Sequence, residues 1–230
     1  MKTITKLIVA IVVVGTSFTS CKNSSEENQE ANKVVETTEE EVSTEAETMV
    51  NTVLNANLAT EADLNGLGLS SEMISQILEN RPFLDMKDLD AILQGVNKEE
   101  LYKKMFVPFN LNTTAEADFK MIPGVGDRMA HEFEEYRPYT SVKQFKKEIG
   151  KYVDQNQVEH YLNYVFVPVE LNTASEEDIK ALPGVGNRMA HEFEEYRPYT
   201  SMSQFRKEIG KYVDDKELAR LERFVYLKDK

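Results

Sequence analysis

The chain has 230 residues, with 40 acidic against 27 basic side chains and a formal net charge of −13 at neutral pH. This length allows one to three small domains. The single cysteine excludes a disulfide framework and a zinc site built from cysteines, and the sequence pI of about 4.8 argues against a strongly basic nucleic-acid-binding surface.

Residues 1–20 have the pattern of a secretory signal peptide. Two lysines precede an apolar core at residues 7–15, which is too short to span a bilayer, since a spanning helix needs roughly 20 residues. The small residues before Cys21 resemble a bacterial lipobox, although Phe18 stands where that motif usually has leucine. The resemblance implies cleavage before Cys21 and a diacylglycerol on its thiol, which would anchor the mature chain to a membrane.

Residues 21–49 are expected to form a disordered acidic tether. The stretch from Cys21 to Leu54 holds nine acidic and two basic residues and no aromatic residue. Such a segment buries too little apolar surface to offset the entropy lost on ordering. We therefore expect it to hold the folded part away from the membrane, with order beginning near residue 49 or 50. A docking tail is the alternative interpretation.

Three copies of one unit follow the tether. Residues 111–154 match residues 171–214 at 34 of 44 positions, and a diverged copy begins at residue 56. The expected modules are 50–107, 108–167 and 168–230.

Each copy is expected to be helical throughout. Thr113 and Glu116 have the spacing of a capping box, as do Thr173 and Glu176, so a short helix should begin after each Asn-Thr pair. After the turn at residues 123–126, four residues fall on one helical face, which we interpret as core: Met129, Ala130, Phe133 and Tyr136. The following Arg-Pro pair should end this helix, because the residue before proline is disfavoured in the helical conformation.

The second half of each unit is expected to be a helix, a turn at Gly150 and a helix through about Val165. Short extended links at 106–108 and 166–168 should join the units, since no alternating apolar pattern is long enough to indicate a sheet. The predicted fold is therefore all-α, with three small tandem modules.

The segments Pro123–Gly126 and Pro183–Gly186 read Pro-Gly-Val-Gly, each before a helical pattern. Two glycines around one apolar residue let the backbone adopt positive φ angles. The first N–H groups of the following helix have no partner within it, and they point the same way as the helix dipole. Such a turn is typical of an anion site.

These residues, with the repeated Leu-Asn-Thr, Tyr-Arg-Pro-Tyr and Ser-x-x-x-Phe segments, resemble the helix-hairpin-helix domain, most closely the DNA-receptor proteins of bacterial competence (ComEA-like). The resemblance implies that hairpin amides bind DNA phosphates without reading sequence, assisted by an early basic residue. The matching positions are Gly124, Val125, Gly126 and Arg128, and Gly184, Val185, Gly186 and Arg188. The second turn implies a secondary DNA contact at Lys147, Gly150, Lys151, Lys207, Gly210 and Lys211. In the first copy, Ser70 replaces the second glycine and Glu72 the arginine.

Charge argues against strong DNA binding. Residues 55–230 carry a net charge of −8, and Arg128 is expected to pair with Glu132 four residues on, as is Arg188 with Glu192. Exposed pairs of this kind contribute only about 0.3–0.5 kcal/mol, so a phosphate can displace them. We therefore expect binding to be weak, salt-sensitive and independent of sequence.

The sequence thus favours a non-enzymatic lipoprotein of the cell envelope, facing the periplasm or the exterior, that binds duplex DNA in DNA capture or uptake. The alternative is a protein-interaction or scaffold module that keeps the fold without binding DNA. No cofactor or metal is expected, because pairs such as His131 and Glu135 are interpreted as surface pairs on a helix.

Overall fold

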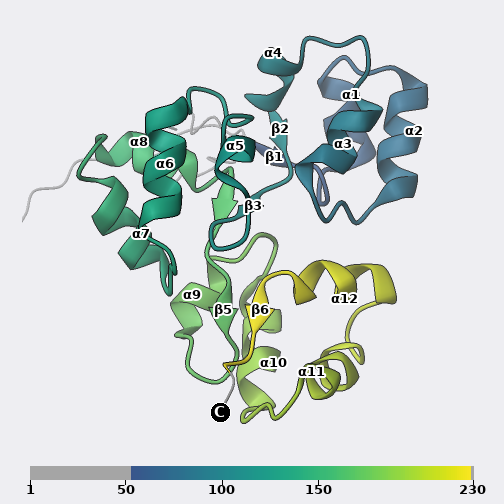
Figure 1. Cartoon of the computed structure of the whole chain (residues 1–230). Helices are drawn as coiled ribbons and strands as arrows, with labels where there is room; N and C mark the ends of the chain where they lie inside the picture. Colours follow the sequence, from purple (N-terminus) through teal and green to yellow (C-terminus); the bar gives the residue numbers. More distant parts are fainter. Residues whose placement is uncertain (1–52, 229–230) are drawn as a thin grey trace, which may run out of the picture. The chain divides into compact units, whose positions relative to one another are not determined.

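The computed structural model describes residues 53–228 (Figure 1). The expected signal peptide, tether and lipidated Cys21 lie outside the described residues. The described part has twelve helices and six strands of two residues each, which confirms the predicted all-α fold. None of these helices combines the length and the apolar character that crossing a bilayer requires.

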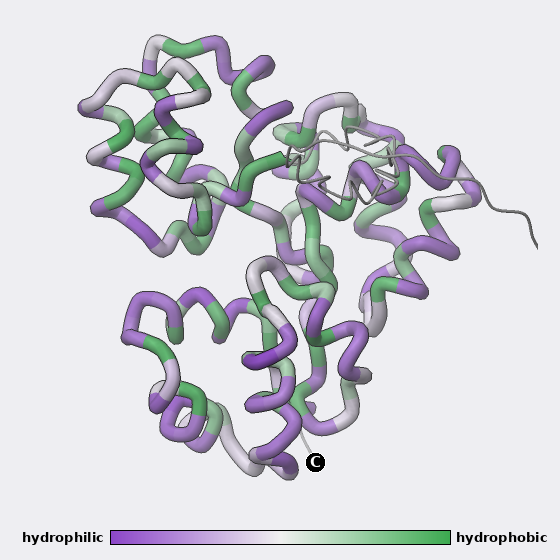
Figure 2. Tube along the Cα trace, turned by 180° about the vertical axis from the view of Figure 1, so that it is seen from behind, coloured by the Kyte–Doolittle hydropathy of each residue, from purple (hydrophilic) through white to green (hydrophobic). Residues whose placement is uncertain are grey.

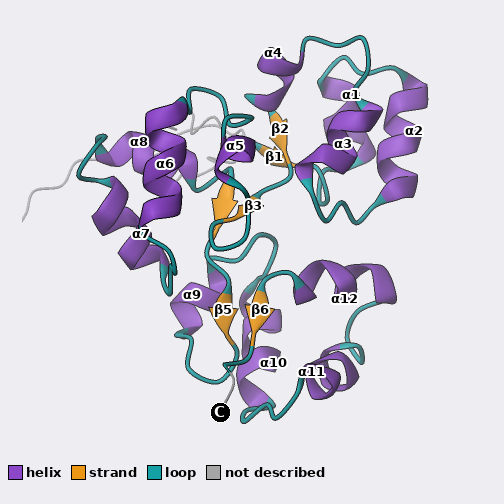
Figure 3. Cartoon of the chain, viewed as in Figure 1, coloured by secondary structure: helices purple, strands orange, loops and turns teal. Residues whose placement is uncertain are grey.

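One order of elements, a strand, four helices and a strand, occurs three times (Figure 3). Module one has β1 (Leu54–Asn55), α1 (Glu61–Gly66), α2 (Ser71–Asn80), α3 (Met86–Ile92), α4 (Lys98–Tyr102) and β2 (Met105–Phe106). Module two has β3 (Phe109–Asn110), α5 (Glu116–Phe119), α6 (Asp127–Glu135), α7 (Val142–Ile149), α8 (Gln155–Tyr161) and β4 (Val165–Phe166). Module three has β5 (Val169–Glu170), α9 (Glu176–Lys180), α10 (Asn187–Glu195), α11 (Met202–Ile209), α12 (Asp215–Glu222) and β6 (Val225–Tyr226).

The two strands of each module pair in parallel, so the start and the end of the module lie side by side. Phe109 aligns with Val165 in module two, and Val169 aligns with Val225 in module three. The links that we expected at 106–108 and 166–168 therefore include paired strands, which the sequence analysis missed. Two residues are too few to show the alternation that identifies a strand.

The core of module two is a cluster of aromatic rings from four helices. Phe133 of α6 is fully buried and meets Phe119, Phe145 and Tyr161 at centroid distances of 5.3, 5.7 and 5.3 Å. In module three the equivalent Phe193 is equally buried and lies 5.2 Å from Phe205. Hydrophobic and hydrophilic residues alternate along the helices (Figure 2), as expected for small helices that bury one face. Ala130 and Phe133 of the stripe predicted on α6 are thus confirmed as core, and Met129 and Tyr136 are partly buried against it.

An asparagine clamp ties the start of each module to the segment after its second helix. The side chain of Asn112 donates to the carbonyl oxygen of Tyr139 at 2.8 Å and accepts from its N–H at 2.7 Å. The same pair of bonds joins Asn172 to Tyr199 and Asn57 to Phe83. Two bonds from one side chain fix both the position and the direction of the partner backbone.

We expect Asn112→Ala to lower the free energy of unfolding by about 2–3 kcal/mol, because it leaves a partly buried N–H and carbonyl without partners. Asn112→Asp should cost less, since a carboxylate can still accept one of the two bonds. Chemical denaturation followed by circular dichroism measures both. Equal stability of the alanine variant and the parent chain would show that the clamp contributes nothing.

The predicted capping boxes are wrong. Helix α5 begins at Glu116 after Ala115, which makes no side-chain cap, and α9 is capped by Ser175. Thr113 is not the N-cap of α5 because it belongs to a turn that precedes the helix. In this turn the N–H groups of residues 113 and 114 donate to the carbonyl of Asn110. The chain therefore enters the helix two residues later than the spacing predicts.

The last helix of module two also ends earlier than predicted. Helix α8 stops at Tyr161, whereas we expected it to continue to about Val165. The carbonyl of Tyr164 instead accepts from Phe109 N–H at 2.8 Å, and Val165 begins β4. Pairing with the first strand of the module therefore takes these residues out of the helix.

Candidate nucleic-acid interface

The first glycine of each hairpin adopts the left-handed conformation. Gly124 has φ = 81° and Gly184 has φ = 73°, and Gly68 of module one has φ = 74°. Other residues are strained at such angles, so glycine is required here by the turn itself. The predicted positive φ is thus confirmed at the first glycine of both Pro-Gly-Val-Gly turns, and the diverged module one has it as well.

The second glycine does not need to be glycine for the sake of the fold. Gly126 has φ = −95° and ψ = −178°, and Gly186 is similarly extended, so our expectation of a positive φ at these positions was wrong. A Cβ atom added to either residue would meet no atom within 4 Å. Neither backbone strain nor packing within the protein accounts for glycine here. A glycine also serves where a ligand must approach the backbone closely.

The valine between the glycines anchors the hairpin in the core. Val125 and Val185 are buried, and their N–H groups donate to Ile122 and Leu182 carbonyls at 3.0 Å. These two amides are therefore already used within the protein. Although both valines were predicted to bind phosphate, the geometry gives them the role of holding the hairpin in place.

The open donors lie one step further along, at the start of α6. Gly126 is its N-cap and makes no side-chain cap, and the first bond within the helix runs from Ala130 N–H to the Gly126 carbonyl at 3.0 Å. The N–H groups of residues 127–129 therefore have no partner inside the helix. Helix α10 begins in the same way after Gly186. Each nine-residue helix thus presents uncapped amides at the positive end of its dipole.

Module one closes the same position with its own side chain. Ser70 is the N-cap of α2, and its hydroxyl accepts from Met73 N–H at 3.2 Å. Glu72 adds a negative charge in the first turn, where modules two and three have arginine. The hydroxyl occupies an amide that an anion would otherwise use, so module one lacks the open site.

Arg128 and Arg188 are exposed beside the open amides, but they do not make the ion pairs that we predicted. Among the described residues, neither forms a salt bridge with the glutamate four positions on. The guanidinium of Arg128 instead lies over the Tyr152 ring, 5.7 Å from its centroid, and Arg188 lies 6.0 Å from that of Tyr212. Glu132 is buried, so it is not available as an exposed partner.

Asp127 and Asn187 make the only difference between the two hairpin sequences. Asp127 is the first residue of α6, its side chain is 89% exposed, and it pairs with Lys120 at 2.9 Å. Hydrogen bonding to Asp127 raises the pKa of Lys120. Module three has the neutral Asn187 in this place, so its hairpin carries one negative charge fewer at the open amides.

The second turn, around Gly150, does not have an open helix end. Its glycine has φ = −61°, and an added Cβ would lie 2.7 Å from the Lys146 carbonyl oxygen, so close packing explains this residue. Asp154 caps the following helix by accepting from Gln157 N–H at 2.8 Å. Gly210 and Asp214 are arranged alike in module three. Backbone amides are thus available at the first hairpin and capped at the second.

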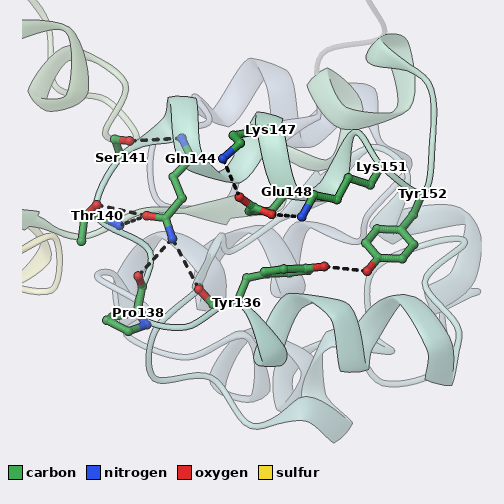
Figure 4. A network of polar contacts seen from close by, with 9 residues as sticks. All are labelled: Tyr136, Pro138, Thr140, Ser141, Gln144, Lys147, Glu148, Lys151 and Tyr152. Atoms are coloured by element: carbon green, nitrogen blue, oxygen red, sulfur yellow. Dashed lines mark hydrogen bonds and ion pairs between the residues drawn. The ribbon is translucent and has the colours of Figure 1, made fainter.

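Lysines provide the positive charge at the second turn (Figure 4). Lys147 and Lys151 both pair with Glu148, the former at 3.4 Å, and Lys207 and Lys211 flank Glu208 in the same way. Hydrogen bonding to Lys151 lowers the pKa of Glu148, so this carboxylate stays charged. Two lysines against one carboxylate leave a net positive charge, and the side chain of Lys147 is 77% exposed.

Arg220 supports the hairpin of module three, a role that was not predicted from the sequence. Its guanidinium is buried, donates to the Pro183 carbonyl at 2.5 Å and pairs with Glu217 at 2.6 Å. It lies in a polar stretch of α12 with no motif, so the pattern gives no sign of this role. Module two has His160 at the equivalent position, which lies against Tyr164 instead.

Comparison with known families identifies one part of the chain. The family model described as "Helix-hairpin-helix motif" matches residues 165–226, which include all of module three. Residues 165–226 are a helix-hairpin-helix motif. No curated protein and no solved structure matches the chain. The motif points to nucleic-acid binding as the general class of function, and the open amides of α10 lie inside the matched range.

The contrast between Ser70 and the two glycine caps gives a direct prediction. Gly126→Ser with Gly186→Ser should stabilise the helices by a few tenths of a kcal/mol, because the new hydroxyls cap them. The same hydroxyls should weaken DNA binding severalfold by occupying the amides. Fluorescence anisotropy and thermal unfolding measure the two effects. The Gly→Ala pair adds a Cβ without an oxygen, so it separates crowding from capping, and unchanged affinity in the serine variant would contradict the assignment.

Proposed function

We propose that this protein is a lipid-anchored protein of the cell envelope that binds duplex DNA without sequence preference, in DNA capture or uptake. The observation that carries the proposal is the uncapped N-terminus of α6 and of α10. Each follows a glycine that neither backbone strain nor packing requires, and an exposed arginine lies beside it. A phosphate group has the charge, the acceptor oxygens and the shape to use such a site.

Modules two and three are the binding modules in this proposal. The family match supports module three, and module two has the same hairpin conformation, the same open helix end and the same arginine. Module one keeps the left-handed Gly68, but Ser70 and Glu72 close its site. We assign it no DNA contact.

The acidic net charge limits the strength of binding rather than preventing it. Amide contacts act at hydrogen-bond distance, whereas exposed charges more than about 8 Å away are largely screened at physiological salt. If each of two modules contacts about two phosphates, the slope of log affinity against log salt should be near −3.6. We therefore propose weak binding that is lost as salt rises.

Membrane anchoring rests on the sequence around Cys21, which resembles a lipobox. Cleavage there would leave a thiol to carry the lipid, and the acidic stretch before residue 50 would separate it from the modules. The modules would then face the periplasm or the exterior, where they would meet DNA from outside the cell. Labelling with a radioactive fatty acid tests this, since Cys21→Ser should abolish incorporation.

Titration of labelled duplex with a fragment that spans the three modules, residues 50–230, tests DNA binding. Anisotropy should rise at low salt, and the affinity should fall with the slope given above at moderate salt. Duplexes of unrelated sequence should bind equally. Absence of binding at low salt would refute the proposed function.

A protein-interaction role is the second candidate, and the closed hairpin of module one favours it. That module keeps the fold and the asparagine clamp, yet it has lost the second glycine and the arginine. Residues 55–107 also hold nine acidic against five basic side chains, which suits a basic protein partner better than DNA. Failure of the duplex titration would leave this candidate in place.

A further inference from the structure

The two turns of each binding module meet at a pair of tyrosines. Tyr136 ends α6 and Tyr152 lies in the second turn, and their hydroxyl oxygens are 2.6 Å apart (Figure 4). Tyr196 and Tyr212 repeat this contact in module three at 2.8 Å. The pair thus links the helix that begins at the first hairpin to the turn that carries the second group of positive charges.

A cation from each turn lies over one of these rings. Arg128, from the first turn of α6, lies over Tyr152 at 5.7 Å, and Lys151 lies over Tyr136 at 4.7 Å. In module three the distances are 6.0 Å for Arg188 over Tyr212 and 4.8 Å for Lys211 over Tyr196. Separations of this size are within the range in which a cation is attracted to an aromatic face. The tyrosines therefore bring an arginine and a lysine from separate turns to one surface.

Glu132 is buried near Tyr152 and forms no salt bridge with Arg128 among the described residues. Its side chain is only 9% exposed, and one carboxylate oxygen has no hydrogen-bond partner within the protein. The pKa of Tyr152 is raised, mainly by hydrogen bonding to Tyr136 and then by hydrogen bonding to Glu132. Its hydroxyl therefore remains protonated and can donate. Glu192 repeats this arrangement beside Tyr212.

Module one has lost the whole group together. It has Glu72 in place of the arginine and Asn80 in place of the first tyrosine, immediately before the Arg-Pro pair. The turn between α3 and α4, residues 93–97, contains no aromatic residue. Module one has the same helices and strands without the tyrosine pair, so the fold itself does not require the pair. Its absence together with the arginine ties the pair to the function of the arginine.

We propose that Tyr152 and Tyr212 are positioning residues, which hold Arg128 and Arg188 beside the open amides so that their N–H donors face a phosphate. Lys151 and Lys211 lie over the other ring of each pair and add a second positive charge to the same surface. This deepens the proposed function and rests on it. A guanidinium attracted to an aromatic ring keeps its N–H donors free for a phosphate, because the attraction to the ring uses none of them as a hydrogen-bond donor to an oxygen.

The test compares two double variants of the full-length protein by duplex titration. Tyr152→Leu with Tyr212→Leu removes the rings and should weaken affinity roughly fivefold or more, which corresponds to two exposed cation–π contacts. Tyr152→Phe with Tyr212→Phe keeps the rings and should retain affinity within about twofold, although it loses the hydroxyl contact. A purely structural role would affect both variants in proportion to their loss of stability.

A double-mutant cycle isolates the positioning effect. In a background of Arg128→Ala with Arg188→Ala, the leucine substitutions should cause no further loss, because there is no guanidinium left to position. With both arginines intact, the NMR signals of their side-chain N–H groups should shift in the leucine variants, which lack the rings. The same signals should stay in place in the phenylalanine variants.

The outcomes separate this inference from the proposed function. If the arginine substitutions weaken binding but the leucine substitutions do not, the positioning role is refuted and DNA binding stands. Additive losses in the cycle would refute it as well. If the parent protein binds DNA but the arginine substitutions have no effect, the inference fails and DNA binding by the amides stands. If the parent protein does not bind at low salt, the proposed function fails and the inference fails with it.

Discussion

Reversing both hairpin arginines, Arg128→Glu with Arg188→Glu, should reduce the affinity for duplex DNA by about 100-fold or more at low salt. Each substitution removes a charge-assisted contact of about 1.5–3 kcal/mol and places a carboxylate beside a phosphate. Because both arginines are exposed and form no salt bridge within the described residues, the fold should not change. The slope of log affinity against log salt should become shallower, from about −3.6 towards −1.8, since fewer phosphates are contacted.

A matched control keeps the change in net charge and moves it away from the binding modules. Lys103→Glu with Lys104→Glu alters two exposed lysines just after α4 in module one. If binding depends on the hairpins, this control should lower affinity only slightly. If it lowers affinity as much as the arginine variant does, binding follows overall charge, and the assignment of the hairpins is wrong.

Phe133→Ala should lower the free energy of unfolding by about 3–5 kcal/mol. The ring is fully buried and contacts three other aromatic rings, so its removal leaves a cavity at the centre of module two. A module of fewer than 60 residues has little stability to spare. We therefore expect module two to be largely unfolded in this variant, with loss of helical circular dichroism.

The identical helix in module three supplies the control for that experiment. Phe193→Ala removes the equivalent ring, which has an edge contact with Phe205, and Ile179 replaces the first phenylalanine of the cluster. The Phe193→Ala substitution should lower the free energy of unfolding by an amount at the lower end of the same range, because a smaller aromatic cluster surrounds this ring. A cost below about 1 kcal/mol at Phe133 would mean that this ring is not the centre of the core.

The helices and the core were predictable because the signals for them are local. Ala130 and Phe133 recur at helical spacing and are buried as expected, and the left-handed Gly124 follows from the sequence of the turn. The internal comparison also identified Ser70 as the counterpart of Gly126, and both are N-caps in the structure. These features depend on a few neighbouring residues.

The features that were not predicted depend on residues far apart in the chain. The strands pair across about 55 residues, and Arg220 reaches Pro183 from another helix. The i to i+4 spacing predicted that Arg128 would pair with Glu132, but Tyr152 from the second turn provides an alternative surface. Glu132 is buried, so it is not exposed beside Arg128 as the helical spacing alone suggests.

The most direct test of the central claim, that backbone amides at the two hairpins bind phosphate, is a backbone amide NMR titration with a short duplex. The largest shifts should occur at residues 126–129 and 186–189, with little change at residues 70–73 of module one. The shifts should disappear as salt is raised. Shifts concentrated on module one, or none at the two hairpins at low salt, would contradict this claim.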